Sequence, residues 1–206
     1  FDVNFSKYKN EVTDWISEFQ PGNDSFRGGA VSRTQVGQPI SSFFGREVIG
    51  FTDEGRFEYR DVNGDTVIDD DDRTFIGSPH PDFTYGFNFN LGYKAFDLSL
   101  FLQGSQGNDI YNYTKIFTDF PTFVDGNRSV RVLDSWTPTN TNATLPALSN
   151  SIQNSETQPN SYFVEDGSYL RLKNVQLGYA FPDKVANKIG LDLLRVYVQA
   201  TNLLTV

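Results

Sequence analysis

The sequence contains no cysteine, no methionine and a single histidine among its 206 residues. The absence of cysteine excludes a disulfide framework, thiol catalysis and any metal site built on cysteine. Without methionine, Phe1 is not a translational start, so we expect a processed form or a fragment, and no signal-peptide pattern opens the chain. No apolar run approaches the ~18 residues that a membrane-spanning helix needs.

Positive charge is also scarce. Lys and Arg total 17 against 26 Asp and Glu, which gives a net charge of −9. Contacts with phosphate require patches of Lys and Arg, so the composition argues against a nucleic-acid partner. The mean hydropathy of −0.42 is that of a soluble protein, but barrel strands alternate apolar and polar residues and averaging hides their signal. Aromatic residues make up 15% of the chain, and Phe and Tyr favour strands and barrel interfaces.

The alternation of apolar and polar residues predicts long strands. Residues 83–93 place Phe, Tyr and Leu on one face and small or polar residues on the other. This length matches a tilted membrane-spanning strand, whereas strands of soluble proteins usually have ~5–6 residues. A second strand starts at Phe96, so close that the two should form an antiparallel hairpin. We predict a lipid-facing surface of Phe83, Tyr85, Phe87, Phe89, Leu91, Tyr93, Phe96, Leu98 and Leu100.

The connections between the predicted strands differ greatly in length. Residues 182–191 form a compact connection with one expected helical turn, whereas 105–168 are rich in Asn, Thr, Ser and Pro. So long an irregular stretch is uncommon in a compact domain unless it is functional. Short connections on one side and long ones on the other are typical of outer-membrane barrels. Less regular patterns predict further strands at 1–10, 11–19, 169–181 and 194–203.

Several sequence blocks, taken in order, resemble those of a known family. Each block is unspecific by itself, but the ordered set runs over nearly the whole chain. In this respect the chain resembles the C-terminal part of SusC/RagA-type TonB-linked outer-membrane proteins. The blocks are Gly37–Gly45, Asp61–Asp65, Ile76–Phe83, Phe101–Asn108, Ser168–Val175, Leu177–Tyr179 and Leu194–Val198, followed by Asn202 and Leu203.

The resemblance implies an all-β fold, namely a segment of an antiparallel transmembrane β-barrel of about 22 strands with a plugged lumen. It implies the outer membrane of a Gram-negative, Bacteroidetes-like cell and transport rather than catalysis. The expected partners are a SusD-like surface lipoprotein, the TonB complex, outer-membrane lipid and a glycan or peptide substrate. The plug, the TonB-interacting segment, the early strands and the closing strand are missing from residues 1–206, so we expect this chain not to close a barrel alone.

Residues 61–72 have the spacing of a calcium-binding loop, in which oxygen ligands occupy positions 1, 3, 5, 7, 9 and 12. Thr66 replaces the usual Gly, Asp72 replaces the usual Glu, and no helix obviously flanks the loop. A solvated acidic loop is therefore the alternative. If Ca²⁺ binds, we expect it to brace an external loop. The predicted ligands are Asp61, Asn63, Asp65, the Val67 carbonyl, Asp69 and Asp72.

Aromatic residues gather within 105–168. Their rings could stack on a sugar or pack against a partner lipoprotein, and we predict such contacts for Tyr111, Tyr113 and Trp136. Alternatively they fold the loop onto itself, together with Phe117, Phe120 and Phe123.

Two other functions stay open from the sequence. A soluble extracellular β-sandwich could bind carbohydrate and hold calcium at 61–72; in that fold Phe83, Phe87, Phe89 and Leu98 would be sealed inside a core. A hydrolase would require an acid pair that one sequence does not reveal, or a triad using His80. His80 lies between two prolines without a nucleophile motif, which favours a structural role.

Overall fold

The computed structural model describes residues 1–22, 29–121, 126–149 and 154–206. The chain forms two compact units, each assembled from separate segments. We call the first the strand unit and the second the loop unit, because the second contains the two long connections between strands of the first. The strand unit comprises Phe1–Lys9, Pro81–Asn108 and Gly167–Val206; the loop unit comprises Asn10–His80 and Asp109–Asp166.

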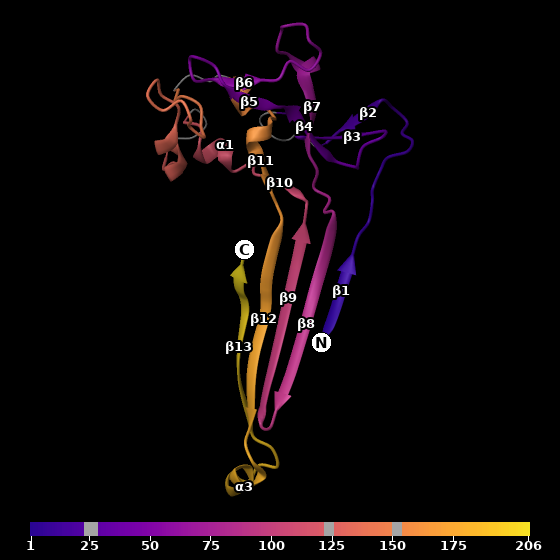
Figure 1. Cartoon of the computed structure of the whole chain (residues 1–206), viewed down its shortest axis with the longest axis vertical. Coiled ribbons are helices and arrows are strands. Elements are labelled where there is room, and N and C mark those ends of the chain that lie inside the picture. The colour runs from indigo at the N-terminus through magenta and orange to yellow at the C-terminus, as the bar shows by residue number, and fades with distance from the viewer. Residues whose placement is uncertain (23–28, 122–125, 150–153) are drawn as a thin grey trace. The chain divides into compact units, whose positions relative to one another are not determined.

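The strand unit is one antiparallel sheet of five strands in the order β1-β8-β9-β12-β13 (Figure 1). The predicted hairpin of two long strands is confirmed, and so are the strands expected near 169–181 and 194–203. The strands are β1 (Asp2–Ser6), β8 (Phe83–Tyr93), β9 (Phe96–Gln106), β12 (Tyr169–Ala180) and β13 (Arg195–Thr205).

The strand expected at 11–19 is wrong for all but its last residue, Phe19, which begins β2. Within this segment Val12 exchanges backbone hydrogen bonds with Gln38 and Gly37, at 3.0 and 2.8 Å. One such contact does not make a ladder, and most side chains of the segment are exposed. Residues 11–18 therefore have no neighbouring strand with which to form a ladder.

A bulge in β12 explains why its first half does not alternate regularly. Toward β9, the pairing moves from Leu172–Leu102 to Asn174–Phe101, so Lys173 is the extra residue. Toward β13, the register also shifts at this point, but there the extra residue lies in β13. Because of the shift toward β9, Leu172 lies opposite Leu102, and Val175 lies opposite Leu100. Both therefore share one face of the sheet although they are three residues apart.

The strand unit has two short connections. Lys94 and Ala95 join β8 to β9, and Lys94 has a φ of 54°. The connection from β12 to β13 contains the predicted helical turn, formed by α3 (Asp183–Ala186) and η4 (Asn187–Ile189). Gly190 ends η4 with a φ of 76°, the left-handed conformation that glycine adopts readily at helix ends.

The described residues of the loop unit form three small antiparallel sheets and several short helices, so the region 105–168 is less irregular than its composition predicts. Among the described residues, no helix is long and apolar enough to cross a membrane. The sheets are β2 (Phe19–Pro21), β3 (Ser32–Gln35), β4 (Ser42–Arg46) and β7 (Arg73–Gly77); β5 (Val48–Phe51) and β6 (Phe57–Tyr59); and β10 (Asp109–Tyr111) and β11 (Val164–Asp166). The helices are η1 (Asp70–Asp72), α1 (Lys115–Thr118), η2 (Val130–Asp134), α2 (Asn154–Thr157) and η3 (Ser161–Phe163).

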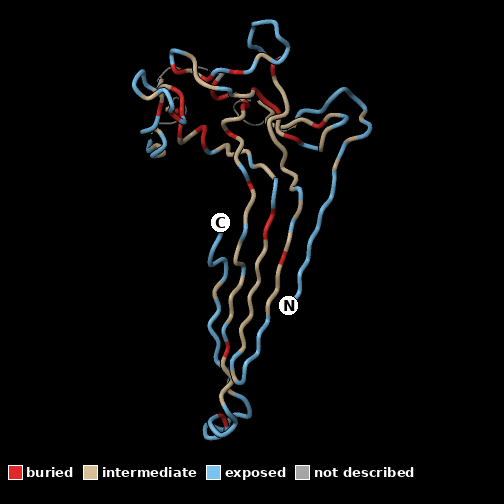
Figure 2. The backbone as a smooth tube through the Cα atoms, viewed as in Figure 1, coloured by how far each residue is buried: buried red, intermediate tan, exposed pale blue. Residues whose placement is uncertain are grey.

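One apolar core joins the two long connections within the loop unit. Phe57 and Tyr59 come from the first connection, and Ile116, Phe120 and Phe163 come from the second. Ile116 and Phe163 are 0% and 1% exposed, and buried stretches recur along this part of the chain (Figure 2). Burying each such side chain contributes roughly 1.5–3 kcal/mol. The two long connections therefore fold as one body rather than as separate loops.

Candidate functional site

One face of the five-stranded sheet is apolar from edge to edge, and we call it the apolar wall. All nine residues predicted to face lipid lie on it. Cross-strand pairing extends the wall, since Phe89 lies opposite Leu100, Leu100 opposite Val175 and Val175 opposite Ala200. Its members are Val3, Phe5, Phe83, Tyr85, Phe87, Phe89, Leu91, Tyr93, Phe96, Leu98, Leu100, Leu102, Leu172, Val175, Leu177, Tyr179, Val196, Val198, Ala200 and Leu204.

The wall is not sealed inside a core. Leu177 is 51% exposed and Val198 is 75% exposed, and Phe83, Phe87, Phe89 and Leu98 are only half-buried. The strand unit contains one sheet and no second layer among the described residues. This is the arrangement of a sheet whose apolar side needs a non-aqueous neighbour.

The opposite face of the sheet is mainly polar, with Phe101 and Tyr197 as exceptions. Arg195 donates to both carboxylate oxygens of Asp97, at 3.0 and 2.6 Å, and Gln199 donates to Asn174 at 2.8 Å. A Cβ at Gly178 would lie 2.5 Å from both the Arg195 guanidinium and the Asp97 carboxylate, so glycine leaves room for this ion pair. An apolar face backed by a hydrogen-bonded polar face is the pattern of barrel strands between lipid and a wet interior.

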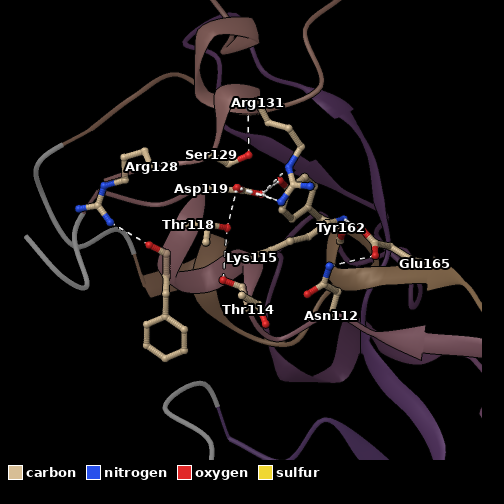
Figure 3. A network of polar contacts seen from close by, with 11 residues as sticks. Asn112, Thr114, Lys115, Thr118, Asp119, Arg128, Ser129, Arg131, Tyr162 and Glu165 are labelled. Carbon is tan, nitrogen blue, oxygen red and sulfur yellow. Dashed lines mark hydrogen bonds and ion pairs between the residues drawn. The ribbon is translucent and has the colours of Figure 1, made fainter. Parts of the chain in front are cut away.

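In the loop unit, a buried carboxylate ties α1 to two other elements (Figure 3). The side chain of Asp119 is fully buried. It accepts hydrogen bonds from Arg131 Nε and Nη2 at 3.2 and 3.1 Å, from the Tyr162 hydroxyl at 2.5 Å and from the Thr118 hydroxyl at 2.9 Å. Burial, followed by the Asp119 carboxylate, raises the pKa of Tyr162 above its ordinary value. The hydrogen bond to Asp119 raises the pKa of Arg131.

A second cluster lies beside the first. The Lys115 ammonium donates to the Tyr162 carbonyl at 2.8 Å and pairs with Glu165 at 2.7 Å, and Asn112 donates to the other Glu165 oxygen at 3.0 Å. Burial opposes ionisation of Glu165, but the bonds from Lys115 and Asn112 prevail and lower its pKa. Ser129 N–H also donates to the Thr118 carbonyl at 3.0 Å. These contacts fix α1 against η2, η3 and β11.

The acidic loop 61–72 directs its carboxylates at its own backbone. Asp61 accepts from Gly64 and Thr66 N–H, at 2.6 and 2.8 Å, and Asp65 accepts from Val67 N–H at 2.8 Å. Thr66 has a φ of 68°, the left-handed conformation that glycine usually provides at this position of a calcium loop.

The last predicted ligand of this loop is buried. Asp72, 0% exposed, accepts from Val62 and Asp69 N–H at 2.8 and 2.9 Å, and the bonds from Asp69 and then Val62 lower its pKa. The other predicted ligands Asn63, Val67 and Asp69 are exposed. Across the described part of the chain, no group of three or more His, Asp or Glu side chains is gathered as a metal centre requires. Calcium binding stays a prediction.

Arg46 links the acidic loop to the second long connection. Its guanidinium donates to the Asp69 carbonyl at 3.1 Å, to Asp70 at 3.2 Å and to the Gln158 side chain at 2.6 Å. Its backbone N–H donates to the Pro159 carbonyl at 3.0 Å. Arg46 is 9% exposed, so water reaches its guanidinium little, whereas the Asp70 carboxylate is 82% exposed and stays hydrated. The bonds to the Asp69 carbonyl, to Gln158 and to Pro159 hold the acidic loop against residues 158–160.

The chain was then compared with known proteins. No protein-family model matches it. It is 36% identical to TonB-dependent receptor P3 of Formosa agariphila over an alignment of 226 positions, which covers 98% of this chain and 22% of the relative. It is 35% identical to TonB-dependent receptor P26 of the same organism, over 88% of this chain and 20% of the relative. It is 28% identical to TonB-dependent receptor SusC of Bacteroides thetaiotaomicron, over 85% of this chain and 16% of the relative.

A solved structure of the RagAB peptide transporter superposes on 99% of this chain and 23% of the solved chain, with a TM-score of 0.80 and 26% identity. The chain belongs to the SusC/RagA type of TonB-dependent receptors. It corresponds to a C-terminal part of these receptors and spans about a fifth of the length of the relatives it matches. The resemblance inferred from the sequence blocks is thereby confirmed, and the observed antiparallel sheets agree with it. The described residues form no closed barrel.

The loop aromatics of this receptor segment mostly fold the loop unit onto itself. Tyr111 lies 5.6 Å from Phe163, ring centre to ring centre, and Tyr113 packs on Phe117 at 5.6 Å. Trp136 lies over Gly55, where a Cβ would come within 2.3 Å of the indole. The suggested substrate or partner contacts of Tyr111, Tyr113 and Trp136 stay a prediction, and Phe123 lies outside the described residues.

The single histidine of the segment has a structural contact. One ring nitrogen of His80 lies 2.8 Å from the Ile40 carbonyl, and the His80 N–H donates to the Ser78 hydroxyl at 3.2 Å.

Sequence reasoning missed Asp119 and Arg46, the two residues that organise the loop unit. Each is a common charged residue in a polar stretch, and its partners lie elsewhere in the chain: Tyr162 is 43 residues from Asp119, and Gln158 is 112 residues from Arg46. Phe57 and Tyr59 flank Glu58, and this alternation of apolar and polar residues marks a half-buried strand. The alternation could have indicated that this strand belongs to the core of the loop unit.

Proposed function

We propose that this chain supplies part of the wall and of the outer surface of a TonB-dependent nutrient importer in the outer membrane. The observation that carries the proposal is the apolar wall, which spans all five strands and stays open on its outer side. Soluble monomers rarely expose continuous apolar patches of this extent, and such patches mark protein or membrane contacts. Lipid is the neighbour that suits long tilted strands with a polar reverse face.

The sheet edges favour a barrel that is completed by other strands. β1 and β13 each pair on one side only, and nearly all their residues are exposed. In the hydrocarbon region, an unpaired backbone group costs several kcal/mol, so an open edge is not tolerated there. We infer that strands outside this chain pair with β1 and β13 to close the barrel.

The orientation follows from the lengths of the connections. Outer-membrane barrels have short periplasmic turns and longer extracellular loops. The Lys94–Ala95 turn and the 181–194 connection would then lie in the periplasm, and the loop unit would lie at the cell surface. In this orientation the networks of Asp119 and Arg46 would belong to the part of the receptor proposed to meet its substrates.

The partners and cargo are proposed from the relatives. One relative is a TonB-dependent receptor and one solved neighbour is a peptide transporter, which supports uptake of peptides; glycans are the other cargo that the resemblance to SusC/RagA-type proteins implies. A SusD-like lipoprotein would contact the loop unit, where Val130 and Leu133 on η2 are 80% and 87% exposed. Energy would come from the TonB complex through parts of the receptor outside this chain.

The soluble carbohydrate-binding sandwich is not favoured. A sandwich requires a second sheet packed on the apolar face, about 10 Å away. The strand unit has one sheet among its described residues, and the exposure of Leu177 and Val198 is inconsistent with an inner sandwich face.

The test compares lysine on the two faces of β8 in the full-length receptor. Phe89→Lys places a charge on the apolar wall, where it should destabilise the barrel by about 2–4 kcal/mol near the bilayer centre. Asn90→Lys places the same charge on the polar face and should cost much less. The readout is the fraction of receptor in native outer membranes that keeps its heat-modifiable, folded form on gels. Equal tolerance of both variants would contradict a lipid-facing wall.

The cargo is tested separately. A strain lacking the receptor gene should lose growth on the transported glycan or peptide as sole nutrient and regain it with the wild-type gene. Undiminished growth on every glycan and peptide offered would refute the import role while leaving the membrane placement intact.

A further inference from the structure

We infer that the helical connection α3–η4 lies flat on the periplasmic surface of the outer membrane, with Val185 and Ile189 inserted among phospholipid chains. The inference rests on the proposed lipid-facing wall and adds to it a second kind of membrane contact. The connection sits at the tip of the β12–β13 hairpin (Figure 1). It would hold the tip of the hairpin at the membrane surface, beyond the residues of β12 and β13 that pairing within the sheet holds in place.

The first observation is the exposure of apolar side chains that a periplasmic turn does not require. Val185 and Ile189 are 42% and 62% exposed, and Leu193, just before β13, is 68% exposed. Val185 and Ile189 are four residues apart, so they lie on one side of the helical connection. A turn that met only water would more readily carry polar residues at these positions.

The second observation is that the apolar wall continues to the base of this connection. Phe181 follows Tyr179 by two residues and therefore shares its face, and their rings lie 4.9 Å apart. Tyr179 also packs against Phe96 at 4.7 Å. Phe181 N–H donates to the Leu194 carbonyl at 2.8 Å, which closes the base of the connection. Aromatic residues collected at one strand end are typical of the boundary between lipid chains and headgroups.

The third observation is that the connection has a fixed fold. Ala186 is 0% exposed, and its carbonyl accepts from Leu191 N–H at 3.1 Å. Val185 N–H donates to the Pro182 carbonyl at 2.8 Å, and Gly190 N–H donates to the Asn187 carbonyl at 3.2 Å. Because these bonds turn the chain back on itself, Val185 and Ile189 keep their outward direction.

The placement of charge, rather than its sum, favours phospholipid as the occupant, because Asp183 and Asp192 balance the two lysines of the connection. Lys184 and Lys188 are exposed and are also four residues apart, so they form a stripe next to Val185 and Ile189. Amphipathic segments of this kind sink about 5–10 Å into the headgroup boundary, where lysines reach phosphates while apolar neighbours enter the chains. Asp183 and Asn187 lie on the opposite side, where water would remain.

Single-cysteine labelling tests the inference: residues 1–206 contain no cysteine, and any cysteine elsewhere in the receptor is first replaced with serine. The full-length receptor is reconstituted in phospholipid nanodiscs with an environment-sensitive fluorophore on Ile189→Cys, and bromines are placed on the lipid chains at a shallow or a deep position. Asn187→Cys is the matched control on the opposite side. Leu177→Cys reports on the apolar wall itself.

The expected result is strong quenching at position 189 by shallow bromines, at least roughly half of that at position 177, with little quenching at 187. Quenching at 177 without quenching at 189 would overturn the anchor and leave the proposed wall standing. Absence of quenching at both positions would refute the wall as well. Quenching of 187 and 189 to the same degree would show a connection immersed without orientation, which also contradicts the inference.

Discussion

Replacing Asp119 with Asn tests whether its buried carboxylate holds the second long connection together. The carboxylate is fully buried, and it accepts from the Arg131 guanidinium, from the Tyr162 hydroxyl at 2.5 Å and from the Thr118 hydroxyl. An amide has nearly the same shape but carries no charge and has one acceptor oxygen. Its nitrogen would face the N–H groups of Arg131, so donors would oppose donors.

The expected cost follows from the exposure of the partners. Removing one member of a buried ion pair costs about 3–5 kcal/mol, mostly because the other charge stays buried. The Arg131 side chain is 45% exposed, so water can take over part of its hydration. We therefore expect a smaller cost, about 2–3 kcal/mol, which includes the weaker hydrogen bond from half-buried Tyr162.

Hydrogen exchange in the full-length receptor measures this cost locally. A loss of 2–3 kcal/mol in the opening free energy predicts amide exchange about 30- to 150-fold faster in α1 and η3. The strand unit should not change. Asp53→Asn, an exposed carboxylate in the turn before β6, is the control and should leave exchange in α1 and η3 unaltered. Asp119→Asn exchange within twofold of wild type would refute the reasoning.

Three further predictions concern the loop unit. If residues 61–72 bind calcium, terbium bound at the loop should luminesce, and calcium should displace it with a dissociation constant of about 10⁻⁴–10⁻³ M, as in extracellular modules. The luminescence should be lost in Asp61→Ala. Equal luminescence in the wild type and this variant contradicts the site. Burial raises the pKa of Glu156, so the folded state holds its proton more tightly than the unfolded state. Stability should therefore fall as pH rises from the ordinary glutamate value through the raised one, and Glu156→Gln should remove this dependence in hydrogen exchange of residues 156–163. Gly55→Ala should destabilise the loop unit by more than about 1 kcal/mol, because φ is 75° and the new methyl would meet Trp136; unchanged tryptophan emission and thermal unfolding would count against it.

The strand unit was largely predictable, because its information is local. Alternation over 83–93 fixes which side chains share a face, and the two-residue link at Lys94–Ala95 fixes the partner strand. The bulge at Lys173 was not predictable, since a single inserted residue looks like a loss of alternation rather than a shift of it. The bulge brings Leu172 and Val175 to the same face of the sheet, and this follows only from the pairing of β12 with β9, in which they lie opposite Leu102 and Leu100.

The loop unit was not predictable, and the reason is sequence separation. Its core joins Phe57 to Phe163 across the whole of β8 and β9. Short strands of three residues, such as β6 and β10, carry too few positions for a periodic signal. Their stability comes from tertiary packing, which a single sequence does not encode in its local pattern.

The hydrogen bonds of Arg46 and Asp119 connect parts of the loop unit that could move together when the receptor responds at its surface. Because Arg46 binds the acidic loop through Asp69 and Asp70 and binds the second connection through Gln158 and Pro159, any shift of the acidic loop strains both sets of bonds. Residue 160 caps η3, where Asn160 accepts from Tyr162 N–H at 3.0 Å, and Tyr162 in turn donates to Asp119. Half-buried hydrogen bonds, joined by the short backbone segment 159–162, therefore connect the acidic loop to α1. Coupling along this connection is measurable as a double-mutant cycle between Arg46→Lys and Asp119→Asn: an interaction free energy above about 0.5 kcal/mol supports transmission, and additive effects exclude it.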